Sequence, residues 1–129
     1  MTPLNPDTIA APFGNYSHGI TTGQVIVTSG QLGLGADGSI PVGVEAQAEI
    51  CFENIRQILA EAGADFSQVV RFSAYVTKRE DMPAYMRVRD RMTAGLSVKP
   101  ASTLMIVTGF TKPEFLVEVE ATAVLPTSV

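Results

Sequence analysis

The sequence predicts an α+β fold in which two helices cover one face of a mixed, mainly antiparallel sheet. Apolar residues recur with helical spacing over 43–62 and 82–93, and with strand spacing in the segments around them. In chain order the elements read strand, strand, helix, strand, helix, strand, strand. Two helices can cover only one face of such a sheet. Several strands are nevertheless apolar or mixed on both faces, so the second face also needs a cover.

Composition supports this reading. The chain has 129 residues, and we expect 1–129 to form a single domain. Only 17 % of the residues are charged, whereas 46 % are hydrophobic. A small monomer normally covers its surface with charged side chains, so the shortfall predicts a homo-oligomer. The net charge of −4 argues against nucleic acid as a partner, because such binding depends on neutralising phosphates.

Residue counts exclude several kinds of site. One cysteine and one histidine leave no disulfide framework and argue against a metal site or a Ser-His-Asp triad. We therefore predict no cofactor and no metal. The N-terminus lacks the pattern of a signal peptide, and no apolar run approaches the roughly 20 residues that span a bilayer. We expect a cytoplasmic protein that does not bind membranes.

The first third of the chain is predicted to form an irregular arm, a hairpin and a loop. Residues 1–15 are rich in Pro, Asn and Gly and read as the arm. Two strands, over 16–21 and 24–29, follow, and Gly23 supplies the positive φ of a tight turn between them. Residues 32–41 read as a loop.

The pattern over 43–62 is the clearest in the chain. Apolar residues recur there at spacings of three and four, and Gly63 is suited to end a helix. Cys51 lies on or beside the apolar stripe. Because no histidine is near to activate it, we interpret Cys51 as a core residue rather than a nucleophile.

The next segments continue the alternation. Residues 69–77 read as a strand, whose predicted apolar face is Val70, Phe72, Ala74 and Val76. A helix over 82–93 follows, with Asp81 as its cap and Gly95 closing it. Residues 101–108 are apolar on both faces, which is typical of a central strand.

The last strand, over 114–124, carries the most informative pattern. One face is wholly apolar and consists of Phe115, Val117, Val119, Ala121 and Ala123. The other face mixes Leu116 and Val124 with Glu118, Glu120 and Thr122. A covered face that keeps acids indicates a pocket or a subunit interface, where burial tunes a carboxyl for proton transfer. The alternative is an edge strand with two solvated glutamates.

Five segments carry a more specific signal: 11–19 (APFGNYSHG), 27–31 (VTSGQ), 47–55 (QAEICFENI), 99–103 (KPAST) and 117–121 (VEVEA). In this order and spacing they resemble the Rid family, also called YjgF or L-PSP, over almost the whole chain. The resemblance implies a chorismate-mutase-like fold assembled as a homotrimer. In it the three sheets would form a central barrel, with helices outside and pockets between subunits.

The resemblance also implies an activity. Well-known members resemble hydrolases of reactive enamines and imines, such as 2-aminoacrylate. The acid of the family's last-strand motif falls on Glu120, which would handle the attacking water before ammonia is released. The family's pocket tyrosine falls on Tyr16, as a second catalytic group that orients substrate or water. Ser29, Gly30 and Gln31 would bind the substrate, and Gly30 permits close approach because it lacks a side chain.

One departure bears on the substrate. Deaminating members carry an arginine in a Pro-Ala-Arg-Ser segment, where it grips the substrate carboxylate. Here Ser102 occupies the arginine's position, and Thr103 follows it. Losing two charge-assisted hydrogen bonds lowers the affinity for a carboxylate by orders of magnitude. The chain therefore resembles an arginine-lacking subgroup, and Ser102 and Thr103 would contact a substrate that lacks an α-carboxylate or binds it differently.

Four other residues admit alternatives. Arg89 is either a replacement cation or a long side chain at a subunit rim, and the pattern favours the rim. Lys99 has the opposite strand parity to Ser102 and is predicted to point away from its pocket. His18 is either an acid/base group or ligand contact at the pocket mouth, or a hydrogen-bonded interface histidine. Glu118 is predicted as an interface or rim residue.

Three functions follow. The first is a RidA-like hydrolase of a small imine or enamine. The second is a trimer that binds or senses a small metabolite without turnover. The third is an endoribonuclease or translation inhibitor, which the acidic composition disfavours because no basic or aromatic stripe is present.

Overall fold

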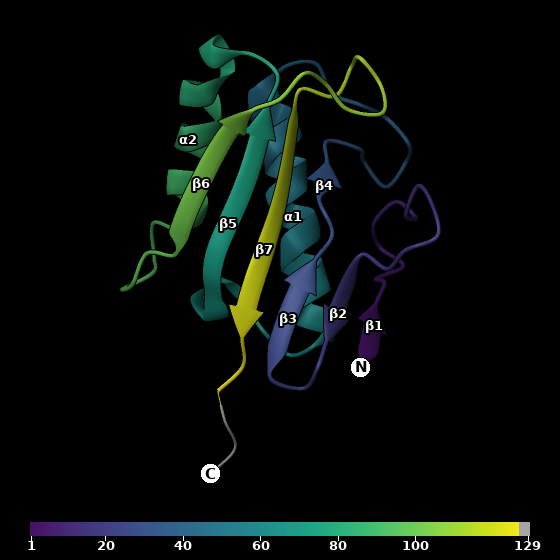
Figure 1. Cartoon of the computed structure of the whole chain (residues 1–129), viewed down its shortest axis with the longest axis vertical. Helices are drawn as coiled ribbons and strands as arrows, with labels where there is room; N and C mark the ends of the chain where they lie inside the picture. Colours follow the sequence, from purple (N-terminus) through teal and green to yellow (C-terminus); the bar gives the residue numbers. More distant parts are fainter. Residues whose placement is uncertain (127–129) are drawn as a thin grey trace.

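The computed structural model of the chain describes residues 1–126 (Figure 1). Its strands are β1 (Thr2–Leu4), β2 (Gly19–Thr21), β3 (Val25–Thr28), β4 (Gln31–Leu32), β5 (Val69–Val76), β6 (Ala101–Ile106) and β7 (Val117–Val124). Its helices are α1 (Val44–Glu61), α2 (Met82–Met92) and the short 3-10 turns η1 (Phe66–Gln68) and η2 (Arg79–Asp81). No helix among the described residues is long and apolar enough to cross a bilayer.

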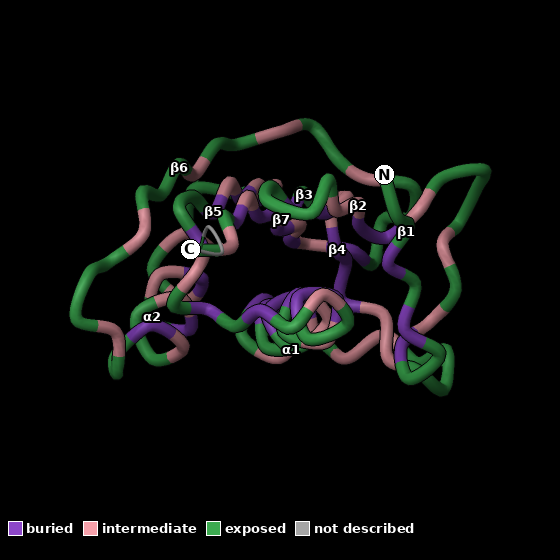
Figure 2. The backbone as a smooth tube through the Cα atoms, turned by 90° about the horizontal axis from the view of Figure 1, so that it is seen from below, coloured by how far each residue is buried: buried purple, intermediate pink, exposed green. Residues whose placement is uncertain are grey.

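One twisted sheet contains all the strands. Its order is β1-β2-β3-β7-β5-β6, and β4 pairs with β7 beside the end of β3. Every pairing is antiparallel except that of β5 with β6, which α2 connects. Both long helices lie on the same side of this sheet (Figure 2). The predicted α+β fold, with a mixed, mainly antiparallel sheet and two helices on one face, is confirmed.

The core lies between the helices and the sheet. The apolar stripe of α1 is buried as predicted, and Cys51 is a core residue with no exposed surface. Phe52 stands at the centre, with its ring centroid 5.1 Å from Phe72 of β5, 6.3 Å from Phe66 of η1 and 5.9 Å from Tyr85 of α2. This aromatic cluster joins three of the elements that surround it.

Within residues 1–126, no helix lies over the far face of the sheet. Along β7, Val117, Val119, Ala121 and Ala123 are buried against the helices, as the period of two predicts. We call the opposite side the open face, and on it Glu118, Glu120 and Thr122 are half-buried. Val25 and Val27 of β3 and Met105 of β6 are exposed there. The open face of a single chain thus combines apolar side chains with acids.

Several sequence predictions were wrong in ways that have a local cause. Val70 is 48 % exposed rather than in the core, because the pairing of β5 with β7 shifts at a bulge between Val69 and Arg71. Val69 is buried in its stead. Asp81 precedes α2 but makes no capping hydrogen bond, and Gly95 lies beyond the cap residue Thr93 without a positive φ.

Two strands were also misjudged. Residues 2–4 of the expected irregular arm form β1 and pair with β2. The strand over 101–108, predicted as central, is β6 at the edge of the sheet, and nearly all of its residues are exposed. On the helix side Leu104 packs against the core, whereas Met105 on the other face is exposed, which leaves room for another copy.

Candidate functional site

The open face is shaped by a break between β3 and β4. Both strands pair with β7, at Thr122 for β3 and at Val119 for β4. The hydroxyl of Thr28 fills the gap and accepts a hydrogen bond from the backbone N–H of Ala121 at 3.0 Å. Ser29 and Gly30 form the connection between the two strands and belong to neither of them.

Gly30 lies directly against Glu118. A Cβ at Gly30 would stand 2.5 Å from Cδ of Glu118 and 2.7 Å from its Oε1, which is closer than real side chains approach. Only a residue without a side chain lets the Glu118 carboxyl and this backbone lie together. The group that approaches Gly30 within the chain is Glu118, and the approach of a substrate to Gly30 stays a prediction.

The two acids of β7 differ in their surroundings. Burial raises the pKa of Glu118 above its ordinary value of 4.5, and the charge of Glu120 adds to the effect. Glu120 accepts a hydrogen bond of 2.5 Å from the hydroxyl of Tyr75 on β5. That bond is the main cause of the raised pKa of Tyr75. Burial therefore favours the protonated form of Glu118, whereas Glu120 accepts a hydrogen bond from a phenol.

A buried network fixes the loop beside these acids. Nε2 of His18 donates to the carbonyl of Ala10 at 2.7 Å, so its Nδ1 is the acceptor for the side-chain amide of Gln31 at 3.3 Å. The same Gln31 amide donates to the carbonyl of Ser29 at 3.2 Å, and its oxygen accepts from Asn54 of α1 at 3.3 Å. Both ring nitrogens of His18 are engaged within one chain, so the hydrogen-bonded alternative describes its contacts.

Tyr16 and Ser29 belong to the same region. The Ser29 hydroxyl donates to the carbonyl of Ser17 at 2.7 Å, which ties the residue next to Tyr16 to the turn before Gly30. The Tyr16 side chain is 46 % exposed, and its hydroxyl accepts from the backbone N–H of Phe13 at 3.2 Å. The phenol is thus held by the loop yet open to a molecule arriving from outside.

The space among these residues is small. Tyr16, His18, Gly30 and Gln31 line one cavity together with Asn54, and its volume is about 20 Å³. That is room for about one water molecule. The structure brings four of the predicted site residues together, but a substrate would need additional space outside this chain's own walls.

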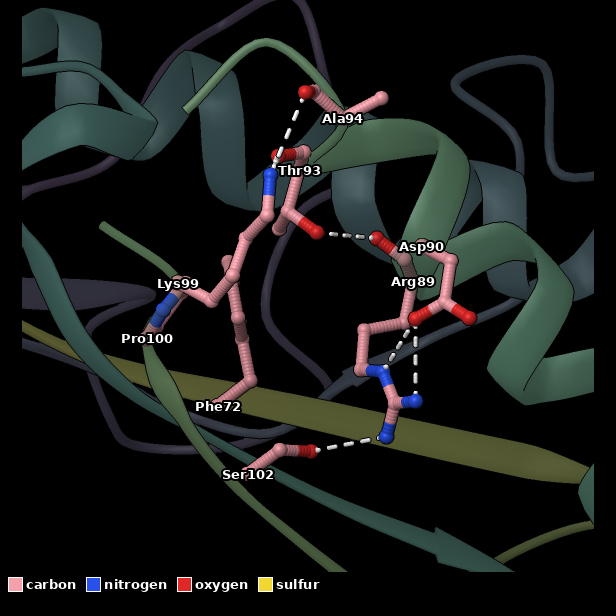
Figure 3. A pocket seen from close by; sticks show the side chains of 8 residues that line it. All are labelled: Phe72, Arg89, Asp90, Thr93, Ala94, Lys99, Pro100 and Ser102. Carbon is pink, nitrogen blue, oxygen red and sulfur yellow. Dashed lines mark hydrogen bonds and ion pairs between the residues drawn. The ribbon is translucent and has the colours of Figure 1, made fainter. Parts of the chain in front are cut away.

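Ser102 lies in a different place. It faces the helix layer, where Nη1 of Arg89 on α2 donates to its hydroxyl at 3.3 Å (Figure 3). The two residues line a cavity of about 460 Å³ between α2 and the start of β6. Thr103 points to the other face, where its hydroxyl accepts from Nη1 of Arg71 at 2.5 Å. Adjacent residues of a strand point to opposite faces, so Ser102 and Thr103 cannot line one pocket wall of the same chain.

Lys99 corrects one prediction. It lines the same cavity as Ser102 rather than pointing away, because it precedes β6 and strand parity does not extend to it. Its ammonium donates to the carbonyls of Thr93, Ala94 and Leu96 at 2.9, 3.2 and 2.8 Å. The Lys99 ammonium therefore caps the C-terminal end of α2, where the helix dipole favours a cation.

The predicted residues form two groups that one chain does not unite. Three strand spacings separate β6 from β4, which is roughly 14 Å at about 4.8 Å per strand. Ser102 also faces the helix layer, whereas Glu118 and Glu120 face the open side. A small ligand cannot contact both groups within one chain.

Some residues of the site were not anticipated. The sequence places Tyr75 on the non-core face of its strand, with Arg71 and Ser73, but does not mark it as a site residue. Asn54 lies in the segment 47–55 that carries the family resemblance, but no role was predicted for it. Tyr85 reads as a core aromatic residue, and its neighbourhood with Ser102 depends on how α2 packs on the sheet. Residues 1–126 hold no cluster of His, Cys, Asp and Glu that could bind a metal.

Known proteins resemble this chain in sequence and in fold. A sequence profile of the family described as Endoribonuclease L-PSP matches residues 8–125. The RutC family protein slr0709 of Synechocystis is 32 % identical over 124 residues, covering 91 % of each chain. The 2-iminobutanoate/2-iminopropanoate deaminase of Dermatophagoides farinae is 28 % identical over 85 residues, covering 64 % of this chain and 63 % of its own length.

A solved structure shares the fold. The crystal structure of E. coli TdcF with bound serine superposes with a TM-score of 0.92, covering 98 % of this chain and 100 % of that one. The two sequences are 23 % identical, so this likeness concerns the fold alone.

Proposed function

The chain belongs to the Rid family, also called YjgF or L-PSP, and from this premise we propose that it hydrolyses a small imine or enamine in a pocket between subunits. A relative named as a 2-iminobutanoate/2-iminopropanoate deaminase supports this class of reaction. The observation that carries the proposal is the Glu118 carboxyl, which lies against Gly30 on the open face with its pKa raised by burial.

The reaction needs a group that both accepts and donates a proton. Water adds to the imine carbon, the resulting carbinolamine loses ammonia, and a carbonyl compound remains. A carboxylate takes the proton from the attacking water, and the carboxylic acid returns it to the leaving nitrogen. An acid whose pKa approaches the working pH serves both steps best.

Two carboxyls are available for these steps. The resemblance assigns the water to Glu120, and the contacts favour Glu118 for the proton transfer. We propose that the two acids act together, with Glu118 exchanging protons. Glu120 is hydrogen-bonded to Tyr75, and its nearby charge helps to keep the pKa of Glu118 raised. Tyr16 and the backbone at Ser29, Gly30 and Gln31 would orient the substrate.

A homotrimer with a central barrel would complete the site. The open face exposes Val25, Val27 and Met105, the last on the edge strand β6. A second copy seated on this face would bury these side chains. Its Ser102 and Arg89 could then approach the Tyr16 and Glu118 region of the first copy, which is impossible within one chain. Thr103 and Arg71 would lie at the contact between copies.

A trimer that binds a metabolite without turnover is the second candidate. The observation in its favour is Ser102, which stands where deaminating members carry the arginine that grips a substrate. In that case Glu118 and Glu120 would contribute to binding only.

The test is the rate of imine hydrolysis. An amino-acid oxidase or dehydratase generates imines of several sizes in the presence of semicarbazide, and the protein competes with trapping. We expect the wild type to accelerate hydrolysis and Glu118→Gln to lose about a hundredfold or more of the rate. Glu114→Gln, an exposed acid just before β7, is the matched control and should keep the full rate.

Comparison of variants separates the candidates. Loss of rate in Glu120→Gln but not in Glu118→Gln would return the proton transfer to Glu120. Activity that appears only in Ser102→Arg would indicate intact machinery and a natural substrate without the usual carboxylate contact. No hydrolysis by any of these proteins would favour the binding trimer.

A further inference from the structure

The cavity beside α2 contains a cation that faces into it. The Arg89 side chain is 25 % exposed, so most of it lies within the fold. Nη1 of its guanidinium is directed at Ser102, while Nε and Nη2 meet one carboxylate oxygen of Asp90 at 3.0 Å (Figure 3). The Asp90 side chain is 69 % exposed and can turn away into solvent. The guanidinium therefore has one hydrogen-bonding edge open and another held by a replaceable partner.

A buried hydroxyl nearby lacks a partner. Tyr85 of α2 is fully buried, and its Oη has no hydrogen-bond partner among the described residues. Ser102 and Arg89 lie near enough to lower the pKa of Tyr85 against the larger effect of burial, which raises it. Leaving a buried hydroxyl unsatisfied is unfavourable, and Tyr85 stands behind Ser102 rather than in the lining of the cavity.

The other cation of the cavity is already engaged. The Lys99 ammonium is bound to three carbonyls at the end of α2, so it contributes positive potential rather than a free donor. The remaining wall is largely apolar and includes Phe72, Ala94 and Pro100. The Arg89 guanidinium and the Ser102 hydroxyl, together with this apolar wall, suit a molecule with a carboxylate head and a hydrocarbon body.

We propose that this cavity binds the carboxylate of a small organic acid, with Arg89 as its cationic contact and Ser102 as a hydroxyl donor. The volume of about 460 Å³ leaves room for an apolar body of several carbon atoms. The Arg89–Asp90 pair opens on binding, and the ligand oxygen replaces that of Asp90. The positive charge comes from helix α2, although the strand position that Ser102 occupies carries no cation.

The inference rests on the proposed function only for what happens to the ligand afterwards. If the cavity forms one wall of the pocket between subunits, the substrate is an imine that bears a carboxylate and an apolar side chain. Binding of the carboxylate itself requires no turnover, so it can be measured separately.

The experiment is a heteronuclear NMR titration of the intact protein with 3-methylbutanoate and with the uncharged 3-methylbutanamide. We expect saturable shifts around Ser102 for the acid and at least tenfold weaker binding of the amide. Arg89→Gln should weaken binding of the acid by about tenfold to a hundredfold, since a charge-assisted contact is lost. Arg87→Gln, an exposed arginine of the same helix, should bind like the wild type.

Each other result overturns the inference. These are equal affinity for acid and amide, no binding by the wild type, or Arg89→Gln binding like Arg87→Gln. If Arg89→Gln fails to fold, Arg89→Lys keeps the charge without the planar fork, and its affinity must fall between those of the wild type and the amide complex. Hydrolysis by a protein that binds the acid no more tightly than the amide would contradict this inference alone, whereas carboxylate binding without hydrolysis would contradict the proposed function alone.

Discussion

At the scale of single residues, the proposed activity depends on the two acids of β7, Glu118 and Glu120. The sequence predicts that Glu118 and Glu120 share a face, because the period of two holds along a regular strand. It cannot tell which acid meets Gly30, since that contact depends on the break between β3 and β4. Only the fold therefore shows the environment of each carboxyl. Burial raises the pKa of Glu118, and Glu120 accepts a hydrogen bond from the Tyr75 hydroxyl.

The raised pKa of Glu118 predicts how stability depends on pH. Folding favours its protonated form, so the stabilisation is complete below its ordinary pKa of 4.5 and is lost as pH rises through the raised value. Glu118→Gln does not ionise. Its free energy of unfolding relative to the wild type should therefore increase from pH 4 to pH 8, measured in urea at one fixed protein concentration. A difference that stays flat, or that is matched by the exposed Glu61→Gln, would contradict the assignment.

A methyl group at Gly30 tests the contact itself. Gly30→Ala would displace the Glu118 carboxyl, which is the flexible end of a side chain and can move. We therefore expect at least a tenfold loss of imine hydrolysis with a change in unfolding free energy below about 1 kcal/mol. Gly95→Ala, where an added Cβ meets nothing within 4 Å, is the control for both measurements. Full activity in Gly30→Ala would show that the close approach is not required.

At the scale of elements, local pattern and long-range pairing contribute differently. Helix α1 was predicted over 43–62 and spans Val44–Glu61, because its apolar stripe and Gly63 (φ 74°) specify it locally. The bulge in β5 and the edge position of β6 depend on which strands pair, and no local pattern encodes that. For the same reason, the sequence does not show that Ser102 faces the helix layer, away from Glu118 and Glu120 on the open face.

Gln47 ties α1 to the segment that leads into β7. It is buried, and its amide donates to the carbonyls of Pro41 and Glu114 at 2.9 and 2.8 Å while its oxygen accepts from the N–H of Leu116 at 2.9 Å. Gln47→Leu leaves three backbone groups without this partner and should cost at least about 2 kcal/mol in urea denaturation. Glu53→Leu, exposed on the same helix, should cost less than about 1 kcal/mol. Equal costs would contradict the role of Gln47.

At the scale of the whole molecule, the open face predicts association. Val27 is 44 % exposed in one chain and stands on the face that a second copy would cover. Light scattering should give the wild type the mass of three 13.7 kDa chains, and Val27→Glu should dissociate it because a buried unpaired charge is unfavourable. Val42→Glu, at a loop position that is 98 % exposed, should remain trimeric. A monomeric wild type would remove the site between subunits.

The sequence anticipates this assembly only indirectly, through low charge and strands that are apolar on both sides. The proposed number of copies, three, rests on the resemblance to the Rid family, and the open face of the single chain is the reason to expect more than one. Glu118 and Ser102 lie on opposite faces of one sheet and near different edges, so only separate copies can bring them to one ligand.

Subunit mixing tests the shared site most directly. One variant, Glu118→Gln/Glu120→Gln, lacks the acids, and the other, Ser102→Trp, fills the cavity beside Arg89. Each homotrimer should be inactive in imine hydrolysis. Trimers reassembled from an equal mixture should regain part of the wild-type rate, because some pockets then take intact acids from one chain and an intact cavity from the next. If the mixture stays as inactive as its parts while forming mixed trimers, the site is not built from two copies of the chain.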